Sequence, residues 1–385
     1  MLATKVSFLE AMRLGALWIF FQQIQRARAR NEKCLVIEDG GYLMPLINQF
    51  CLEGHSLGDV LRNYAIPEHD FDQSELYRPL RDWLGGTLLG SIEHTRNGYD
   101  MLVAIQERFG CLAFPTGTIA VSEFKRTIEA DEVARSCVLA IQMILYSAGQ
   151  TLTNRRGVII GSRGHIGRYL VELLGFILGH QRICGVVIVV PPAGRFIEDG
   201  VHHWYSFDDI PEEYLKDSDL FIGVSGCSVI DAPRLERLIK ITRHEDLYFA
   251  SGSTKTIEYT DLLSWVETLL RSGTPSIGGE PVQMEKMVMR DPLSRLDQGI
   301  TVVIRFTRIS KVRRLHLMAH LMPVNFLYYG VPREIIDIVI TQLLEISIGL
   351  STRARNGDTL PPKLLALDKN REFTIFRDGG RLEEK

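Results

Sequence analysis

The sequence predicts an α/β protein built around a Rossmann-type, doubly wound parallel sheet. Residues 155–174, "RRGVIIGSRGHIGRYLVELL", have the pattern of a buried strand, a glycine turn and the start of a helix. Further strands and helices of similar length alternate after it. The chain has 385 residues, which is enough for two or three domains.

Strands and helices alternate regularly after the glycine turn. Apolar runs predict strands at 157–161, 185–190, 219–226 and 247–253, and helices are predicted at 166–179, 232–242 and 260–270. Alternation of this length is typical of a doubly wound parallel sheet. We therefore expect a cofactor-binding Rossmann domain over residues 150–325.

The regions on either side predict a smaller set of elements. Residues 6–30 and 129–148 have helical periodicity, "CLVIED" at 34–39 has the form of a short parallel strand, and 111–121 are predicted to be extended. Residues 297–309 and 313–330 predict an antiparallel addition to the sheet. A helix at 332–350 and a polar tail from Ser351 follow.

The composition argues against several function classes. The net charge of -3 provides no basic field for nucleic acid or anionic lipid. The six cysteines form no C-x-x-C pair and no Cys/His cluster, which favours a reducing compartment and no metal site. The apolar run near the N-terminus is far shorter than the roughly 20 residues of a membrane span. We expect a cytoplasmic protein.

The glycine turn is the strongest candidate for a ligand site. Its glycines follow a G-x-x-G-x-x-G pattern, and Ser162 stands where the strict dinucleotide motif has glycine. Such glycines let the backbone approach a pyrophosphate, and the helix N-terminus offers N–H donors. A tight corner without a ligand is the alternative. We assign the binding of NAD or NADP to Gly161, Ser162, Arg163, Gly164, His165, Ile166 and Gly167.

Two other strand ends bear on the cofactor. The second strand of the sheet has no acid at its end, so a ribose phosphate would meet no repulsion there, and Arg195 could pair with it. This favours NADP over NAD, although Arg195 as a solvated loop residue is the alternative. Residues Val224, Ser225 and Gly226 end another strand at the carboxyl edge, where ligands bind, and are also assigned to the cofactor.

Six collinear motifs resemble those of S-adenosylhomocysteine hydrolases and their divergent relatives. "VIEDGGYL" is similar to an acid-Asp-Gly-Gly motif of that family, "IEHTRNGY" to its Glu-Glu-Thr-Thr-Thr-Gly segment, and "GSRGHIGR" to its cofactor loop. "LFIGVSGCSVI", "FASGSTKTIEY" and "MPVNFLYYGVPREIID" are similar to later motifs in the same order. The resemblance runs from about Cys34 to Leu350.

The resemblance implies an architecture and a set of roles. The Rossmann lobe would be inserted between two halves of a smaller α/β substrate-type lobe, 1–149 and 326–385, with helices 129–148 and 332–350 as hinges. Asp39, His94 and Lys125 become candidates for moving a proton, and Thr95, Asn97 and Asn325 for contacting the nicotinamide. Each residue also has a structural alternative: Asp39 as a turn carboxylate, His94 as a packed histidine, Lys125 as a solvated lysine, Thr95 and Asn97 as surface caps, and Asn325 as a turn asparagine.

The departures from the family restrict the expected chemistry. Its catalytic Lys and Asp are out of register, with Glu123 and Thr127 near their places, and its Gly-His-Pro motif reads Gly330-Val331-Pro332. We therefore expect an NAD(P)-dependent oxidoreductase-like enzyme that acts on a small molecule, with a homodimer as its assembly. Two alternatives are a hydrolase or lyase of the family type with re-sited residues, and a non-catalytic nucleotide-binding regulatory protein.

Overall fold

The computed structural model describes residues 8–188, 195–252 and 258–379. The chain divides into two compact units. Unit 1 comprises Met1–Arg126 and Glu334–Lys385, and unit 2 comprises Thr127–Arg333. Unit 2 is thus inserted between two parts of unit 1, and the predicted fold class is confirmed. The sequence analysis assigns residues 127–149 to the first lobe and 326–333 to the returning segment, whereas their contacts place both in unit 2.

Unit 1 is a small parallel sheet with helices. Its strands follow the spatial order β1-β2-β3-β14, and every neighbouring pair is parallel. The strands are β1 (Cys34–Glu38), β2 (Leu88–Glu93), β3 (Thr116–Thr118) and β14 (Leu364–Ala366). The helices are α1 (Phe8–Ala29), α2 (Met44–Leu52), α3 (Leu57–Asn63), α4 (Leu80–Leu84), α5 (Arg96–Phe109), α11 (Arg333–Arg355) and α12 (Lys369–Gly379).

The sheet of unit 1 carries a hydrophobic cluster on each face. One cluster gathers α1 to α4 around Leu88 and Phe114, and the other packs α11 against Ile92 and Ile119. Among the described residues, α11 is the one helix that is long and apolar enough to cross a membrane by length and composition, a test that buried helices of soluble proteins also meet. Its Val339 is buried in the second cluster.

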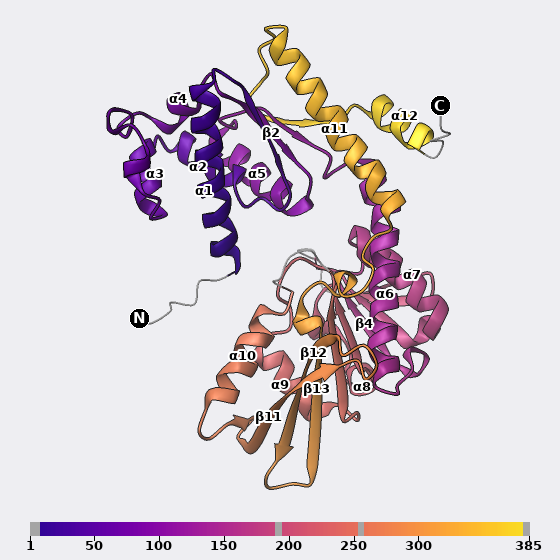
Figure 1. The fold of residues 1–385 in the computed structure, drawn as a ribbon. Coiled ribbons are helices and arrows are strands. Elements are labelled where there is room, and N and C mark those ends of the chain that lie inside the picture. The colour runs from indigo at the N-terminus through magenta and orange to yellow at the C-terminus, as the bar shows by residue number, and fades with distance from the viewer. Residues whose placement is uncertain (1–7, 189–194, 253–257, 380–385) are drawn as a thin grey trace. The chain divides into compact units, whose positions relative to one another are not determined.

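Unit 2 contains the second sheet and the remaining elements (Figure 1). Its helices are α6 (Ala130–Ser147), α7 (His165–Leu178), α8 (Glu212–Lys216), α9 (Ala232–Ile241) and α10 (Thr260–Arg271). Its strands are β4 (Gly157–Ile160), β5 (Ile183–Val186), β6 (Arg195–Glu198), β7 (Val201–Trp204), β8 (Leu220–Gly223), β9 (Asp246–Ser251), β10 (Ser276–Ile277), β11 (Glu280–Arg290), β12 (Asp297–Phe306) and β13 (Lys311–Met318).

The strand order of unit 2 is that of a doubly wound sheet. The full order is β10-β11-β12-β13-β9-β8-β4-β5-β7-β6, and its central part, β13-β9-β8-β4-β5-β7, is parallel throughout. From β4 the chain first moves outward through β5 and β7, and then returns to β8 and β9 on the other side. The order therefore reverses between β4 and β8, where such sheets bind ligands at their carboxyl edge.

A hairpin, β6–β7, ends the sheet on the side of β5. Asp199 (φ 49°) and Gly200 (φ 77°) form its two-residue turn, because the turn favoured by twisted hairpins needs positive φ at both positions. This hairpin was not predicted from the sequence. The second strand was expected to continue to Val190, but residues 189–194 lie outside the described part of the chain.

Candidate functional site

The glycine turn lies between β4 and α7, at the point where the strand order reverses. Gly161 has φ 92°, and a Cβ atom there would lie 2.7 Å from the backbone nitrogen of Ser225. A Cβ atom on Gly167 would lie 2.0 Å from the carbonyl oxygen of Gly161. Both positions therefore require glycine, the first for the turn and the second for close packing of α7 on β4.

The N-cap of α7 is a glycine. Gly164 has no side chain with which to cap the helix, and the first turn contains no acidic residue. The first amides of a helix have no partner within the helix, and the helix dipole places positive charge beside them. His165, Ile166 and Gly167 supply these amides. This end of α7 therefore has the features of an anion-binding site.

The side chain of Ser162 contacts a histidine on β7. The residue is buried, and its Oγ lies 2.9 Å from Nδ1 of His203 on β7. Burial, helped by the charge of Arg163, lowers the pKa of His203 to about 4, so the imidazole is neutral near pH 7. This contact ties the glycine turn to β7 through the Ser162 side chain.

Arg163, and not Arg195, lies beside the turn. The Arg163 guanidinium stands 5.8 Å from the ring centre of Phe196 and forms an ion pair with Glu198, both on β6. Phe196 pairs with His203 and stacks on it, whereas Arg195 pairs with Trp204. Because side chains alternate along a strand, Arg195 points to the opposite face of β6. The sequence analysis had no means of separating these two faces.

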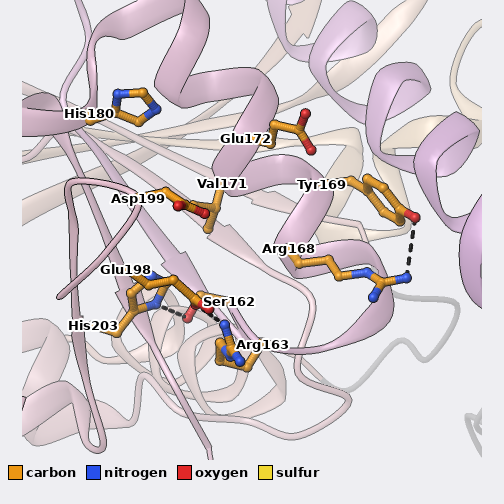
Figure 2. A pocket seen from close by; sticks show the side chains of 10 residues that line it. All are labelled: Ser162, Arg163, Arg168, Tyr169, Val171, Glu172, His180, Glu198, Asp199 and His203. Carbon is orange, nitrogen blue, oxygen red and sulfur yellow. Dashed lines mark hydrogen bonds and ion pairs between the residues drawn. The ribbon is translucent and has the colours of Figure 1, made fainter. Parts of the chain in front are cut away.

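A cavity of about 690 Å³ extends from the turn between α7 and the β6–β7 hairpin (Figure 2). Arg163 and Arg168 line it together with three acids, so its walls carry both signs of charge. Figure 2 shows the ion pair of Arg163 with Glu198 and the contact of Ser162 with His203 at the same end. The lining residues are Ser162, Arg163, Arg168, Tyr169, Val171, Glu172, His180, Glu198, Asp199 and His203.

The loop after β8 faces the glycine turn and is held by a buried carboxylate. Val224 N donates to the carbonyl oxygen of Ile160 at 2.8 Å, which ties the loop to β4. Ser225 Oγ donates to Glu258 Oε2 at 2.7 Å, and Gly226 N donates to the other oxygen of Glu258. The loop was predicted from the sequence, but Glu258 was missed. In the sequence it is only an acidic residue two positions before the start of α10.

Two buried polar atoms at the end of β9 have no partner in the described part of the chain. They are Oδ1 of Asn325 and Oγ of Ser251, and both residues are buried. Ser251 bridges to Pro323, two residues before Asn325, and the backbone carbonyl of Asn325 accepts from Ser136 at 3.2 Å. Because buried polar atoms are normally satisfied, this pair is suited to a polar ligand group such as a carboxamide.

Unit 1 brings together the three predicted proton-transfer residues. Lys125 Nζ lies 2.9 Å from Nε2 of His94, and Nδ1 of His94 lies 3.1 Å from Oδ1 of Asp39. Because a lysine ammonium only donates and an ionised aspartate only accepts, these contacts suit a His94 ring that accepts at Nε2 and donates from Nδ1. The hydrogen bond from His94 lowers the pKa of Asp39.

The three groups come from neighbouring strand ends and a π-helical turn. Asp39 and His94 directly follow β1 and β2, which are paired in register at Glu38 and Glu93. Lys125 begins the π-helical turn Lys125–Glu129. The side chain of Asp39 is 75% exposed and that of His94 is 20% exposed, so the chain of hydrogen bonds leads from solvent into the unit.

Two buried carboxyl groups support this arrangement. Glu38 accepts from the amides of Leu43 and Met44 at the start of α2. Glu93 accepts from the amide and hydroxyl of Thr95, each at 2.7 Å, and its Oε2 has no partner in the described residues. Burial raises the pKa of Glu38, and it raises that of Glu93 to about 7. Glu93 is thus half protonated near neutral pH.

Thr95 and Asn97 have structural partners within unit 1. Thr95 is the N-cap of α5 and accepts from Gly98 N at 3.1 Å, and Asn97 Nδ2 donates to the carbonyl oxygen of Gly40 at 2.8 Å. The Thr95 bond caps α5, and the Asn97 bond ties α5 to the loop that carries Asp39. Their predicted contact with a nicotinamide stays a prediction. No cluster of His, Cys, Asp and Glu suited to a metal ion occurs in the described residues.

Comparisons with known proteins give no family at the level of sequence. No family model and no curated protein matches the chain. The structure is similar to that of a dipicolinate synthase polypeptide from Bacillus halodurans, with 11% identity, a TM-score of 0.30, and coverage of 49% of this chain. The chain spans 59% of that protein's length.

Two further solved structures match most of the chain. One is a probable 2-hydroxyacid dehydrogenase from Rhizobium etli in complex with NADP, HEPES and L(+)-tartaric acid, with 15% identity, TM-score 0.34, and coverage of 88% of this chain and 98% of the other. The other is an NADPH-dependent glyoxylate/hydroxypyruvate reductase from Sinorhizobium meliloti in complex with NADP and sulfate. Its identity to this chain is 14%, the TM-score is 0.35, and the match covers 89% of this chain and 100% of the other. At these identities and TM-scores, none of the three likenesses assigns this chain an activity or a ligand. None is an adenosylhomocysteinase, so that resemblance stays a prediction.

Proposed function

We propose that the protein is an NAD(P)-dependent oxidoreductase that acts on a small molecule. The observation that carries this proposal is the glycine turn at the reversal point of a doubly wound sheet, followed by a helix whose N-cap is a glycine and whose first turn has no acidic residue. A dinucleotide diphosphate is the ligand that this combination of close backbone approach and helix dipole suits best. The side chain of Ser162 does not fill the turn, because it points to His203.

The residues of unit 2 fit both ends of such a cofactor. Amides at the start of α7 would bind the diphosphate, and Arg163 with Glu198 would lie beside the adenosine ribose. Asn325 Oδ1 and Ser251 Oγ would bond the nicotinamide carboxamide, which would satisfy two buried polar atoms. When bound, a nicotinamide supplies a hydride donor or acceptor.

Unit 1 contains a separate set of groups suited to moving a proton. Within this set, Lys125 Nζ would pass a proton to Nε2 of His94, and the Asp39 carboxylate would stabilise the resulting imidazolium through Nδ1. The exposed carboxylate of Asp39 connects this path to solvent.

A second candidate is a hydrolase or lyase on the adenosylhomocysteinase scaffold. The clustering of Asp39, His94 and Lys125 favours it, because two of them lie in the segments that resemble that family and together they form a compact proton-transfer set. The departures of this chain from the family's catalytic residues argue against this second candidate. Release of homocysteine from its adenosyl conjugate would distinguish this candidate from the first.

The cofactor proposal is tested by direct binding. We expect NAD or NADP, oxidised or reduced, to bind the purified protein in calorimetric titrations. Gly164→Asp should weaken the binding by about 100-fold or more, because a carboxylate at the N-cap preserves the helix but repels a diphosphate. Gly273→Asp makes the same change in unit 2 at an open position and should bind as the unchanged protein does.

Two results would contradict the proposal. If the unchanged protein binds none of the four nucleotides, unit 2 is not a nicotinamide-binding domain. If Gly164→Asp binds them as tightly as Gly273→Asp does, the nucleotide lies away from the glycine turn. A protein that binds nucleotide but reduces or oxidises no substrate would instead support the regulatory alternative.

A further inference from the structure

Strand β11 forms an open edge of the sheet in unit 2 (Figure 1). On its inner side it pairs with β12 from Val282 to Arg290. On its outer side, the partner in the described residues is the two-residue strand β10, which pairs only with Glu280 and Pro281. The outer edge from Met284 to Arg290 therefore has no strand beside it in this part of the chain.

The direction of the backbone groups along this edge follows from two hydrogen bonds. Thr307 N donates to the carbonyl oxygen of Pro281 at 3.1 Å, so the peptide groups of Pro281 face β12. Val282 N donates to the carbonyl oxygen of Pro275 at 3.0 Å, on the outer side. Because orientation alternates along a strand, Met284, Lys286 and Val288 turn their N–H and C=O groups outward.

The same stretch is exposed on both faces of the sheet. Met287 and Val288 belong to opposite faces of the strand, and each is 50% exposed. Glu285, Lys286 and Arg290 are exposed as well. A long edge with exposed apolar side chains and outward N–H and C=O groups is a template for another strand.

We propose that the β11 edge pairs with the same edge of a second copy of the chain, in antiparallel orientation about a two-fold axis at Met287. Such a contact is isologous, and two-fold dimers are the commonest oligomers. The two ten-stranded sheets would then join into one continuous sheet. The inference goes beyond the proposed function, because it needs no bound cofactor.

The charges of β11 select this register. Two β11 edges form hydrogen bonds only when outward-facing residues of one copy lie opposite outward-facing residues of the other. Because the outward-facing residues have even numbers, the numbers of any two paired residues must add to an even number. An axis at Glu285 would place two glutamates directly opposite, and an axis at Lys286 would place two lysines opposite. An axis at Val288 would pair Lys286 with Arg290 of the other copy. Like charges at these distances are destabilising.

An axis at Met287 avoids all of these contacts, and it pairs the whole open stretch from Met284 to Arg290, whereas an axis at Met289 would pair only residues 288–290 of that stretch. The axis at Met287 places Met287 against Met287, Lys286 against Val288 and Glu285 against Met289, with Met284 against Arg290 at the ends. Registers with an axis nearer the start of β11 collide with β10, which occupies the outer side at Glu280 and Pro281. A second copy in one register is therefore the occupant that the edge fits best.

The expected dimer is weak. Seven paired residues on each strand bury less surface than the roughly 1,200–2,000 Å² of a standard stable interface. We therefore expect a reversible equilibrium, with a dissociation constant on the order of micromolar. Sedimentation velocity across about 1 to 100 μM protein should show a shift from monomer to dimer.

Two substitutions test the site of contact. Met287→Glu places two carboxylates opposite each other at the axis and should weaken the dimer by about tenfold or more. Leu293→Glu removes a more exposed apolar side chain, 93% exposed, from the β11–β12 turn and should leave the equilibrium unchanged. Far-ultraviolet circular dichroism and melting curves of both variants check that the fold is intact.

Cysteine cross-linking tests the register. Position 287 lies at a non-hydrogen-bonded pair, where Cα atoms are about 4.5 Å apart, so Met287→Cys should form an intermolecular disulfide under mild oxidation. Val288→Cys places the two thiols two residues apart along the strands, at a Cα distance of about 8 Å, which is too far for a disulfide. The unchanged protein, with its six free cysteines, is the control for other cross-links.

The outcomes separate clearly. Concentration-dependent dimers that Met287→Glu weakens and Met287→Cys traps support the proposal. A monomer at every concentration overturns it, and so does a dimer that Met287→Glu leaves unchanged, since another surface then holds the copies together. Cross-linking at position 288 instead of 287 overturns the register. Each result is read without nucleotide, so it is independent of the cofactor proposal.

Discussion

The carboxyl edges of the two parallel sheets differ in what they offer a ligand. The edge in unit 1 is dense with ionisable side chains, since Glu38 and Asp39 end one strand and Glu93 and His94 end the next. The edge in unit 2 offers backbone amides and small residues, among them Gly164 and Ser225. These side chains and amides are the basis for proposing proton transfer at the first edge and a phosphorylated ligand at the second.

The buried titratable groups near the two edges also differ in their preferred state. Glu93 in unit 1 has a raised pKa and is stable when protonated, while His203 in unit 2 has a lowered pKa and is stable when neutral. Each group therefore couples the stability of its unit to pH, in opposite directions. This difference can be tested because the two units have separate hydrophobic clusters.

The largest expected effect comes from close packing in unit 2. In Gly167→Ala the new methyl group would lie 2.0 Å from the backbone of Gly161, which cannot move without disturbing β4. We expect unit 2 to lose about 3–5 kcal/mol of its free energy of unfolding, while unit 1 is unaffected. Urea denaturation followed by hydrogen–deuterium exchange, read separately for peptides of each unit, measures this loss.

Gly349→Ala, in α11, is the matched control for that substitution. A Cβ atom there has open space, so the helix should gain about 0.5–1 kcal/mol from the better helix former. Equal effects of the two alanines would show that α7 does not pack on the glycine turn as described.

A smaller effect is expected from Glu93 in unit 1. Its pKa is about 7 in the folded unit, against 4.5 for an ordinary glutamate. Between these values the folded unit binds the proton more tightly than the unfolded chain does, so stability falls as pH rises. We expect unit 1 to lose about 2–3 kcal/mol between pH 5 and 8.

The variant Glu93→Gln isolates this contribution. The amide resembles the protonated acid and does not titrate, so this loss should disappear from unit 1. Hydrogen–deuterium exchange of peptides from β2 and α5, corrected for the intrinsic rate at each pH, supplies the readout. A variant with the same pH dependence as the unchanged protein would mean that Glu93 titrates normally.

The smallest effect is expected from His203, and it has the opposite sign. Its pKa is about 4 in the folded unit and 6.5 for an ordinary histidine, so the unfolded chain binds the proton more tightly. The contribution of His203 to the stability of unit 2 is therefore present at neutral pH and is lost as pH falls from 6.5 toward 4. We expect unit 2 to lose about 2 kcal/mol between pH 7 and 5, and His203→Gln to remove that loss.

Acidification from pH 7 to 5 should thus stabilise unit 1 through Glu93 and destabilise unit 2 through His203. Thermal melts monitored by exchange in peptides of β2 and β7 give the two trends in one experiment. Parallel changes in both units would rule out this assignment of the two groups.

The sequence predicted the elements whose signals are local. The glycine turn, the parallel strands and the loop at Ser225 follow from apolar runs ended by small residues, and the structure has them where expected. Asp39 and His94 were found because each follows a strand in a motif that resembles a known family. Their direct contact with each other and with Lys125 depends on strand register, which no local pattern specifies.

The missed elements depend on contacts between distant parts of the chain. Strand β11 is exposed on both faces, so it lacks the alternation that marks a half-buried strand. The role of Arg163 depends on β6, a strand of four residues whose existence rests on its turn and its partner β7. Glu258 acts on a loop more than thirty residues away. Such interactions appear only when the chain is folded.

The insertion of unit 2 has a consequence for the order in which the protein is made. On the ribosome, residues 8–126 emerge before unit 2, but β14, which pairs with β3, and α11 emerge only after it. Until then, three of the four strands of the sheet are present, with the edge of β3 unpaired and the face that α11 covers exposed. Unit 2 is one continuous stretch of the chain, so it can complete its own sheet before unit 1 does. The part synthesised first is thus the last to be completed.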